Sequence, residues 1–303
     1  MKKVLTLCLI TLLWSCGETE ITRIVVDPGF SSYVSGFTSG IISSQSTIKV
    51  ILIEPFEGAE DGTEIDKELF EFEPAIEGKA FWVDDQTIEF RPASKLPSGE
   101  NFVGTFYLKE LMQVPDEFEE MRFGFMVIKQ NLFVAFEGLR SVDMNDFSKQ
   151  ELFGSLRTSD GADPIDIQAC LVAEQSGKKL PIEWTHAEDG HAHAFTVKGV
   201  VRGEKASELA LKWDGEPIGA NVSDDLDVRI PPLGEFSLVQ VNTLRAPSLH
   251  FSLQFSDPVD PNQDLTGLIH LNSGKDLRFS VDNNEIKAYP TEQLSSHETI
   301  VIE

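Results

Sequence analysis

The sequence predicts an all-β chain of β-sandwich modules arranged in tandem. Apolar residues alternate with polar ones, or run together over strand lengths, at residues 46–53, 87–91, 122–127 and 249–255. Turn-forming residues separate such segments, and no long stretch has the 3.6-residue period of a helix. The best helical candidate is a turn or so at residues 115–120. Short strands at this spacing are typical of β-sandwiches, and 303 residues suffice for two or three of them.

An internal repeat divides the predicted strands into modules. Residues 87–98 align with residues 285–296 at a constant offset of 198, which matches Ile88 with Ile286, Pro92 with Pro290 and Leu96 with Leu294. We therefore predict a first sandwich at 23–130, a second at 131–232 and a third at 233–303. The third would stop before a counterpart of the strand at 122–127. We expect this last sandwich to be incomplete, and the chain to continue beyond Glu303.

The first 15 residues have the features of a bacterial export signal. Lys2 and Lys3 give a basic start, and residues 4–14 form an apolar run that is too short to span a bilayer. Ser15 and Cys16 resemble the end of a lipoprotein signal, in which a small residue precedes the cysteine that is acylated, although Trp14 departs from the strict motif. We predict a signal peptide at 1–15, lipidation of Cys16 and a tether at 16–22. The alternative is an ordinary signal peptide with an incidental cysteine.

Composition restricts the partners of the mature chain. The sequence has 50 Asp and Glu against 25 Lys and Arg, a formal charge of −25, which excludes a nucleic-acid binder because such proteins neutralise phosphates with clustered cations. The same charge repels anionic headgroups, so membrane attachment is expected through the lipid alone. Only Cys170 lies outside the signal and the lipidation site, so no intrachain disulfide is expected and stability must come from hydrophobic burial.

Segments 30–43, 72–85 and 255–265 resemble the N-terminal region of bacterial alpha-2-macroglobulin-like lipoproteins of the Bacteroidetes type. The resemblance implies macroglobulin-like and immunoglobulin-like sandwiches, which in that family precede a bait region and a thioester domain that trap proteases. It implies that this chain is the non-enzymatic scaffold of an envelope-anchored protease inhibitor, with proteases as partners of a C-terminal part that this sequence lacks. The lipid would anchor the chain in the outer membrane, facing the periplasm or the cell surface.

A second class of function is compatible with the same features. A surface glycan-binding or adhesin lipoprotein would also carry tandem sandwiches behind a lipidated cysteine. Trp82, Trp184 and Trp213 are predicted core anchors, and a carbohydrate platform would need them exposed together. An enzyme is not expected, because the sequence contains no P-loop, Rossmann glycine pattern, nucleophile elbow or zincin helix.

Cys170 does not match the thioester of the family it resembles. That thioester joins a cysteine to a glutamine three residues later, whereas Gln175 follows Cys170 by five residues with no glycine between them. Apolar neighbours on both sides of Cys170 predict a buried strand thiol that behaves as a small hydrophobe.

Two polar clusters are candidate metal sites. His186, His191 and His193 could bind zinc or copper, but residues 188–190 are a hairpin-turn signal, so we expect solvated loop histidines and no metal or other cofactor. Oxygen-bearing side chains at 257–264 could recruit calcium, although the order of an EF-hand is missing and Asp-Pro pairs commonly end strands; they are Asp257, Asp260, Asn262 and Asp264.

Overall fold

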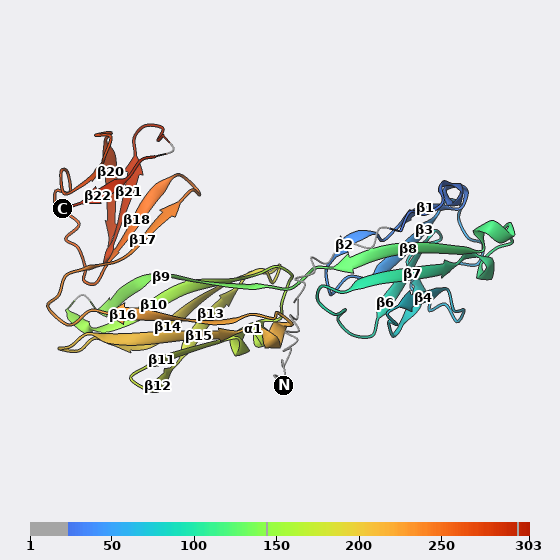
Figure 1. The fold of residues 1–303 in the computed structure, drawn as a ribbon, viewed down its shortest axis with the longest axis horizontal. Helices are drawn as coiled ribbons and strands as arrows, with labels where there is room; N and C mark the ends of the chain where they lie inside the picture. Colours follow the sequence, from blue (N-terminus) through green and yellow to red (C-terminus); the bar gives the residue numbers. More distant parts are fainter. Residues whose placement is uncertain (1–23, 144, 296) are drawn as a thin grey trace, which may run out of the picture. The chain divides into compact units, whose positions relative to one another are not determined.

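The computed structural model describes residues 24–143, 145–295 and 297–303, and it confirms an all-β chain of tandem sandwiches (Figure 1). The chain divides between Val127 and Ile128 into two compact units. The predicted signal peptide, Cys16 and the tether lie outside the described residues. None of the helices in the described part of the chain has the length and hydropathy to span a bilayer.

The first unit is a sandwich of two four-stranded sheets. One sheet has the order β1 (Val34–Phe37), β3 (Ile48–Leu52), β6 (Thr87–Pro92) and β5 (Gly78–Trp82). The other has the order β2 (Gly40–Ile42), β8 (Glu120–Val127), β7 (Asn101–Tyr107) and β4 (Phe70–Glu73). Neighbours are antiparallel except β2 and β8, which are parallel. Three 3₁₀ turns accompany the strands, η1 (Pro28–Ser32), η2 (Leu108–Glu110) and η3 (Asp116–Phe118), the last lying where a helical turn was predicted.

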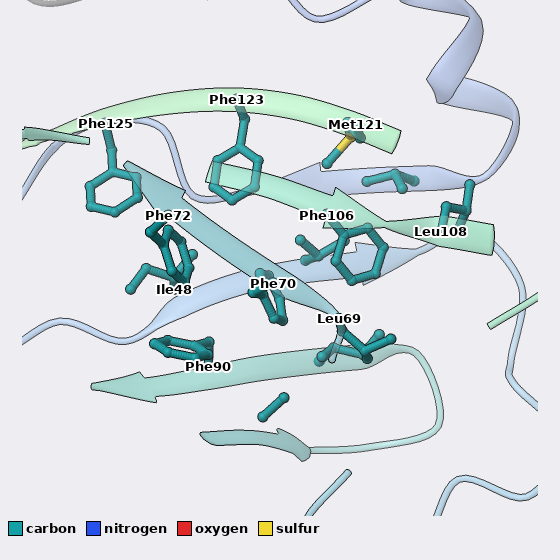
Figure 2. Close-up of a cluster of buried hydrophobic side chains, with 14 of the residues drawn as sticks. Ile48, Leu69, Phe70, Phe72, Phe90, Phe106, Leu108, Met121, Phe123 and Phe125 are labelled. Atoms are coloured by element: carbon teal, nitrogen blue, oxygen red, sulfur yellow. The ribbon is translucent and has the colours of Figure 1, made fainter. Parts of the chain in front are cut away.

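Phenylalanine side chains fill the space between these two sheets (Figure 2). Alternate residues of β8 are buried, as the period-two pattern requires, and Phe123 and Phe125 are at most 1% exposed. The ring centroids of Phe72 and Phe90 lie 4.8 Å apart across the two sheets. Trp82 is 6% exposed, which confirms it as a core anchor. Burial of such rings stabilises the sandwich without any disulfide.

The second sandwich begins the second unit and also has two four-stranded sheets. One has the order β13 (Ile182–His186), β14 (Ala192–Val201), β10 (Asp146–Thr158) and β9 (Leu132–Asp143). The other has the order β12 (Lys178–Leu180), β11 (Leu171–Gln175), β15 (Ser207–Asp214) and β16 (Ser223–Ile230). A short helix, α1 (Pro164–Ala169), precedes β11, and a 3₁₀ turn, η4 (Glu216–Ile218), precedes β16.

The third sandwich completes the second unit. Its larger sheet has the order β17 (Leu238–Leu244), β18 (His250–Phe255), β21 (Glu285–Pro290) and β20 (Leu277–Asp282). Its smaller sheet contains β19 (Ile269–Leu271) and β22 (Ile300–Ile302) within the described residues. Continuation of the chain beyond Glu303 stays a prediction.

The two copies of the sequence repeat occupy the same place in their sheets. Ile88 of β6 pairs with Val50 of β3, and Ile286 of β21 pairs with Leu253 of β18. Both sheets are antiparallel and have the same order of equivalent strands. The constant offset therefore reflects two sandwiches built on one strand plan.

Candidate functional site

A buried arginine joins the second and third sandwiches. Arg202 follows the last residue of β14, and its backbone N–H donates to Ser148 O at 2.9 Å, which fixes the end of β14 beside β10. Its side chain has no exposed surface. A fully enclosed guanidinium requires acceptors for five N–H groups, because leaving a buried donor unpaired costs about 1–3 kcal/mol or more.

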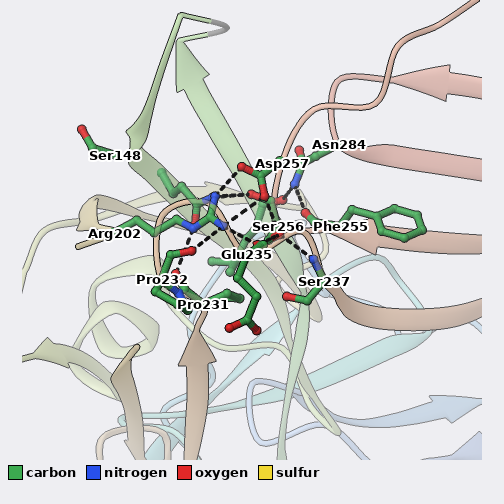
Figure 3. Close-up of polar contacts among 12 residues, drawn as sticks. Ser148, Arg202, Pro231, Pro232, Glu235, Ser237, Phe255, Ser256, Asp257 and Asn284 are labelled. Carbon is green, nitrogen blue, oxygen red and sulfur yellow. Dashed lines mark hydrogen bonds and ion pairs between the residues drawn. The ribbon is translucent and has the colours of Figure 1, made fainter. Parts of the chain in front are cut away.

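The acceptors come from the linker between the second and third sandwiches, residues 231–237, and from the two residues that follow β18 (Figure 3). Nη1 and Nη2 donate to Asp257 Oδ1 at 2.7 Å and Oδ2 at 3.0 Å, a bidentate pair. The linker carbonyls of Pro231, Pro232 and Glu235 accept at 2.9, 2.9 and 2.7 Å. Nη1 also donates to Ser256 O at 3.1 Å. A single side chain thus ties β14, the linker and β18 together.

Further hydrogen bonds surround this pair. Gln150 Nε2 donates to Ser256 O at 2.7 Å, and Ser256 Oγ lies 2.6 Å from Asp257 Oδ2. Asn284 Nδ2 contacts both Phe255 O, at 2.6 Å, and Leu139 O of the second sandwich. The joint is therefore a polar network inside the second unit. Its geometry supports a structural clamp, because both charges are hydrogen-bonded, Arg202 is fully enclosed and the Asp257 side chain is only 15% exposed.

The side chains considered as candidate calcium ligands are engaged separately. Asp257 faces Arg202, whereas Asp260 Oδ1 accepts the backbone N–H of Asn262 at 2.9 Å and Asp264 Oδ1 that of Thr266 at 2.9 Å. The hydrogen bonds of Asp260 and Asp264 therefore stabilise local turns. The described residues contain no group of three or more His, Cys, Asp or Glu side chains suited to a metal.

The histidine cluster lies on the predicted hairpin, but the prediction of solvated loop residues is wrong for His193, which is buried, and for His186, which is the half-buried last residue of β13. β13 and β14 pair antiparallel, and His193 is a residue of β14 with 1% exposure. Gly190 supplies the positive φ of 68° that the turn requires. His193 is buried because its ring packs edge-on against His186, with centroids 5.0 Å apart.

The hydrogen bonds of this pair define one consistent set of neutral tautomers. His193 Nε2 lies 3.1 Å from Gly190 O, a carbonyl that can only accept, so Nε2 carries a proton. His193 Nδ1 then accepts from His186 Nδ1 at 2.9 Å, and His186 Nε2 accepts from Gln168 Nε2 at 3.3 Å. This series of hydrogen bonds links α1 to the hairpin formed by β13 and β14. Burial, reinforced by the repulsion that a protonated His186 would exert, lowers the pKa of His193 below its ordinary value of 6.5.

Cys170 is buried as predicted, but it does not lie in a strand. The segment before it forms α1, started by Pro164 at the first helical turn, and Cys170 caps the C-terminal end of that helix. Its Sγ donates to Asp166 O at 3.3 Å. Burial, with a smaller contribution from Asp214, raises its pKa to about 11, so the thiol is protonated at neutral pH and a poor nucleophile.

The tryptophans of the described residues provide no exposed aromatic platform. Trp184 and Trp213 are partly buried against the core of the second sandwich, as predicted for core anchors. Sequence reasoning missed the Arg202 joint. Its one signal was an arginine placed directly after a long alternating strand, which does not reveal a partner 55 residues later.

Comparisons with known proteins identify no family to which the chain can be assigned. No family model matches it, and no curated protein matches it. L,D-transpeptidase 3 from Mycobacterium tuberculosis, solved with a faropenem-derived adduct, has 10% identity over 75% of this chain and 78% of that chain, with a TM-score of 0.23. Domains 4–9 of the surface layer protein SbsC have 12% identity, 86% and 44% coverage and a TM-score of 0.32. The ectodomain of mouse nectin-like molecule 4 has 10% identity, 88% and 96% coverage and a TM-score of 0.28. TM-scores below 0.5 carry no functional argument.

We predict that Arg202→Met lowers the free energy of unfolding of the second unit by about 3 kcal/mol, because Asp257, whose side chain is only 15% exposed, loses its charge partner. Urea unfolding followed by the fluorescence of Trp184 and Trp213 measures this. Arg140→Met is the matched control. Its 3.0 Å pair with Asp282 is half exposed, so its loss should cost at most about 1 kcal/mol. Equal losses in the two variants would show that the joint is not a clamp.

We also predict an acid-sensitive contribution from His193. Because its native pKa is lowered, the unfolded chain binds the proton more readily; the stabilisation is complete above pH 6.5 and is lost as pH falls below that value. Urea midpoints at about pH 7.5 and about pH 5 should differ less in His193→Gln than in the parent chain. His191→Gln, at the partly exposed turn, should keep the parental difference. An unchanged difference in His193→Gln would contradict the assignment.

Proposed function

We propose that this chain is the non-enzymatic N-terminal scaffold of an envelope-anchored, alpha-2-macroglobulin-like protease trap. The observation that carries the proposal is a strand plan that recurs along a chain of tandem sandwiches. The first and third sandwiches repeat one order of strands, and Arg202 locks the second to the third. The resemblance of segments 30–43, 72–85 and 255–265 to that lipoprotein family supplies the class of function.

The chemistry of the described residues supports a scaffold. Cys170, the one cysteine among them, is enclosed and protonated, and its neighbours do not form a thioester motif. A protease-trapping reaction would therefore belong to other parts of the full-length protein. The role of this chain would be to hold those parts at the membrane, through a lipid on Cys16, with proteases as the partners of the complete molecule.

The alternative, a glycan-binding or adhesin lipoprotein, draws less support from the described residues. Carbohydrate sites commonly stack sugars on exposed aromatic side chains. Trp82 is buried, and Trp184 and Trp213 are partly buried against a core. A glycan array probed with the purified chain tests this alternative directly.

The test of the proposed function uses the native polypeptide, detected in cell envelopes with an antibody against the second sandwich. We expect a polypeptide much longer than 303 residues that captures an added protease covalently, in a reaction that methylamine abolishes. The 303-residue chain alone should capture none. A native polypeptide of 303 residues, or a longer one that captures no protease, would overturn the proposal.

Lipidation of Cys16 is a separate prediction. Cells fed an alkynyl fatty acid should label the chain, and Cys16→Ser should abolish the label because the acylated thiol is gone. Cys170→Ser is the control, and it should retain the label, since that thiol is buried. Equal labelling of parent and Cys16→Ser chains would show that Cys16 is an incidental residue behind an ordinary signal peptide.

A further inference from the structure

A pocket of about 310 Å³ lies between the second and third sandwiches, inside the second unit. Phe153 and Thr196 of the second sandwich form one wall. They lie opposite each other on β10 and β14, and Gly138 of β9 lies opposite Phe153, so the three share one face of the sheet. Their neighbours Leu152 and Val197 are buried in the core, so this face points away from it.

The opposite wall comes from the third sandwich. It contains Gln254 of β18 and Asn284 of the turn before β21, and each of these residues is only 2% exposed. Leu253 belongs to the core of this sandwich, so its neighbour Gln254 points from the other face of the sheet. The pocket therefore lies outside both cores, between two sheet faces.

The side-chain amide of Gln254 has no hydrogen-bond partner among the described residues, although the residue is almost completely enclosed. It can lie close to β9 because Gly138 has no side chain: a Cβ atom there would be 2.8 Å from Cγ and Cδ of Gln254. Enclosing an amide without a partner is unfavourable. One donor group and one acceptor are thus available to a molecule in the pocket.

Asn284 supplies a second acceptor. Its Nδ2 is used at the joint, where it donates to Phe255 O at 2.6 Å (Figure 3). Its Oδ1 accepts no hydrogen bond from the part of the chain that the structure describes. Thr196 adds a hydroxyl group, which can both donate and accept, and the half-buried ring of Phe153 adds an apolar surface.

The charges at the pocket are balanced. Three carboxylates line it, and each is paired with a cation. The N to O distances are 3.0 Å for Arg140–Asp282, 2.7 Å for Lys198–Glu151 and 3.4 Å for Lys287–Glu285. An anion or a cation would therefore find no unpaired counter-charge and would lose its own hydration on entry. A purely apolar molecule would leave the Gln254 amide without a partner.

We propose that this pocket binds one neutral sugar residue. Sugar hydroxyls both donate and accept, as the amide of Gln254 and the free oxygen of Asn284 require, and the C–H face of a sugar ring can pack on Phe153. The volume lies at the small end of ligand sites, which suits a single residue. The inference goes beyond the proposed protease trap, and one phenylalanine is no broad aromatic platform of an adhesin.

The probes are four free sugars, D-glucose, D-galactose, D-mannose and N-acetyl-D-glucosamine, each titrated into the 303-residue chain and followed by NMR. We expect at least one to bind saturably and to shift the side-chain amide resonance of Gln254. Gln254→Met should weaken this binding at least about tenfold, because the sugar hydroxyls lose their partner. Protease capture is not measured, so a failure here leaves the proposed function untouched.

Gln240→Met is the matched control. Gln240 lies opposite Gln254 on the neighbouring strand β17, and its Nε2 already donates to Asn242 Oδ1 at 3.1 Å. It does not line the pocket, so this variant should bind the sugar as the parent does. Gly138→Ala reaches the site without touching the amide itself. Its methyl group would displace the Gln254 side chain, and we expect weaker binding with a native-like NMR spectrum.

Charged derivatives test the balance of charges. The uronic acid and the protonated amino sugar of the hexose that binds should each bind at least about tenfold more weakly. A methyl glycoside shows which source of sugar fits. Binding as tight as that of the free sugar indicates a residue of a glycan, and loss of binding indicates the free sugar. Both outcomes agree with the proposal.

Three results would overturn the proposal. The first is the absence of saturable binding for all four sugars up to about 50 mM. The second is binding that leaves the Gln254 amide resonance unmoved and that both Gln254→Met and Gly138→Ala leave unchanged. The third is tighter binding of a charged derivative than of its neutral parent, because the pocket would then recognise charge.

Discussion

The second unit depends on one charge pair, formed by a fully buried arginine and a largely enclosed aspartate. The Arg202 guanidinium meets Asp257 and three linker carbonyls, so the end of β14, the linker and the end of β18 have a single relative arrangement. Desolvating two charges costs several kcal/mol per ion, and only well-placed hydrogen bonds offset that cost. The pair is thus a weak source of net stability. Its physical consequence is geometric: any other arrangement of these three segments would leave a charge unpaired in the interior.

Each sandwich, by contrast, is held by apolar burial. The phenylalanine-rich core of the first sandwich, the two core clusters of the second and the core of the third are separate clusters, and none of these described residues forms a disulfide. Burial is non-directional, so it stabilises a sandwich without fixing how one sandwich meets the next. The polar network between the second and third sandwiches supplies that direction. Apolar burial therefore stabilises each sandwich, and the polar network orients the third sandwich against the second.

Period and repeat made much of this fold predictable from the sequence. The alternation at residues 48–52 became the buried and exposed alternation of β3, and the constant offset became two equivalent central strands. The joint was not predictable, because Arg202 and Asp257 are far apart in sequence and obey no period. Cys170 shows the limit of apolar patterning: the short run before it reads equally well as strand or helix, and Pro164 starts a helix.

The two copies of the strand plan show that the pairing register of the edge strand and the covering of the core by the opposite sheet have different causes. The bulge and the strand pairs beside it are the same at β1 and β17, although the residue after the bulge is Gly36 in one and Gln240 in the other. Register is therefore set by the sheet itself, through the pairing of its own strands. Closure is set by the opposite sheet, which leaves Val34 of the first sandwich only 6% exposed. Pairing within a sheet and burial between sheets are therefore separate contributions to the fold, the first directional and the second not.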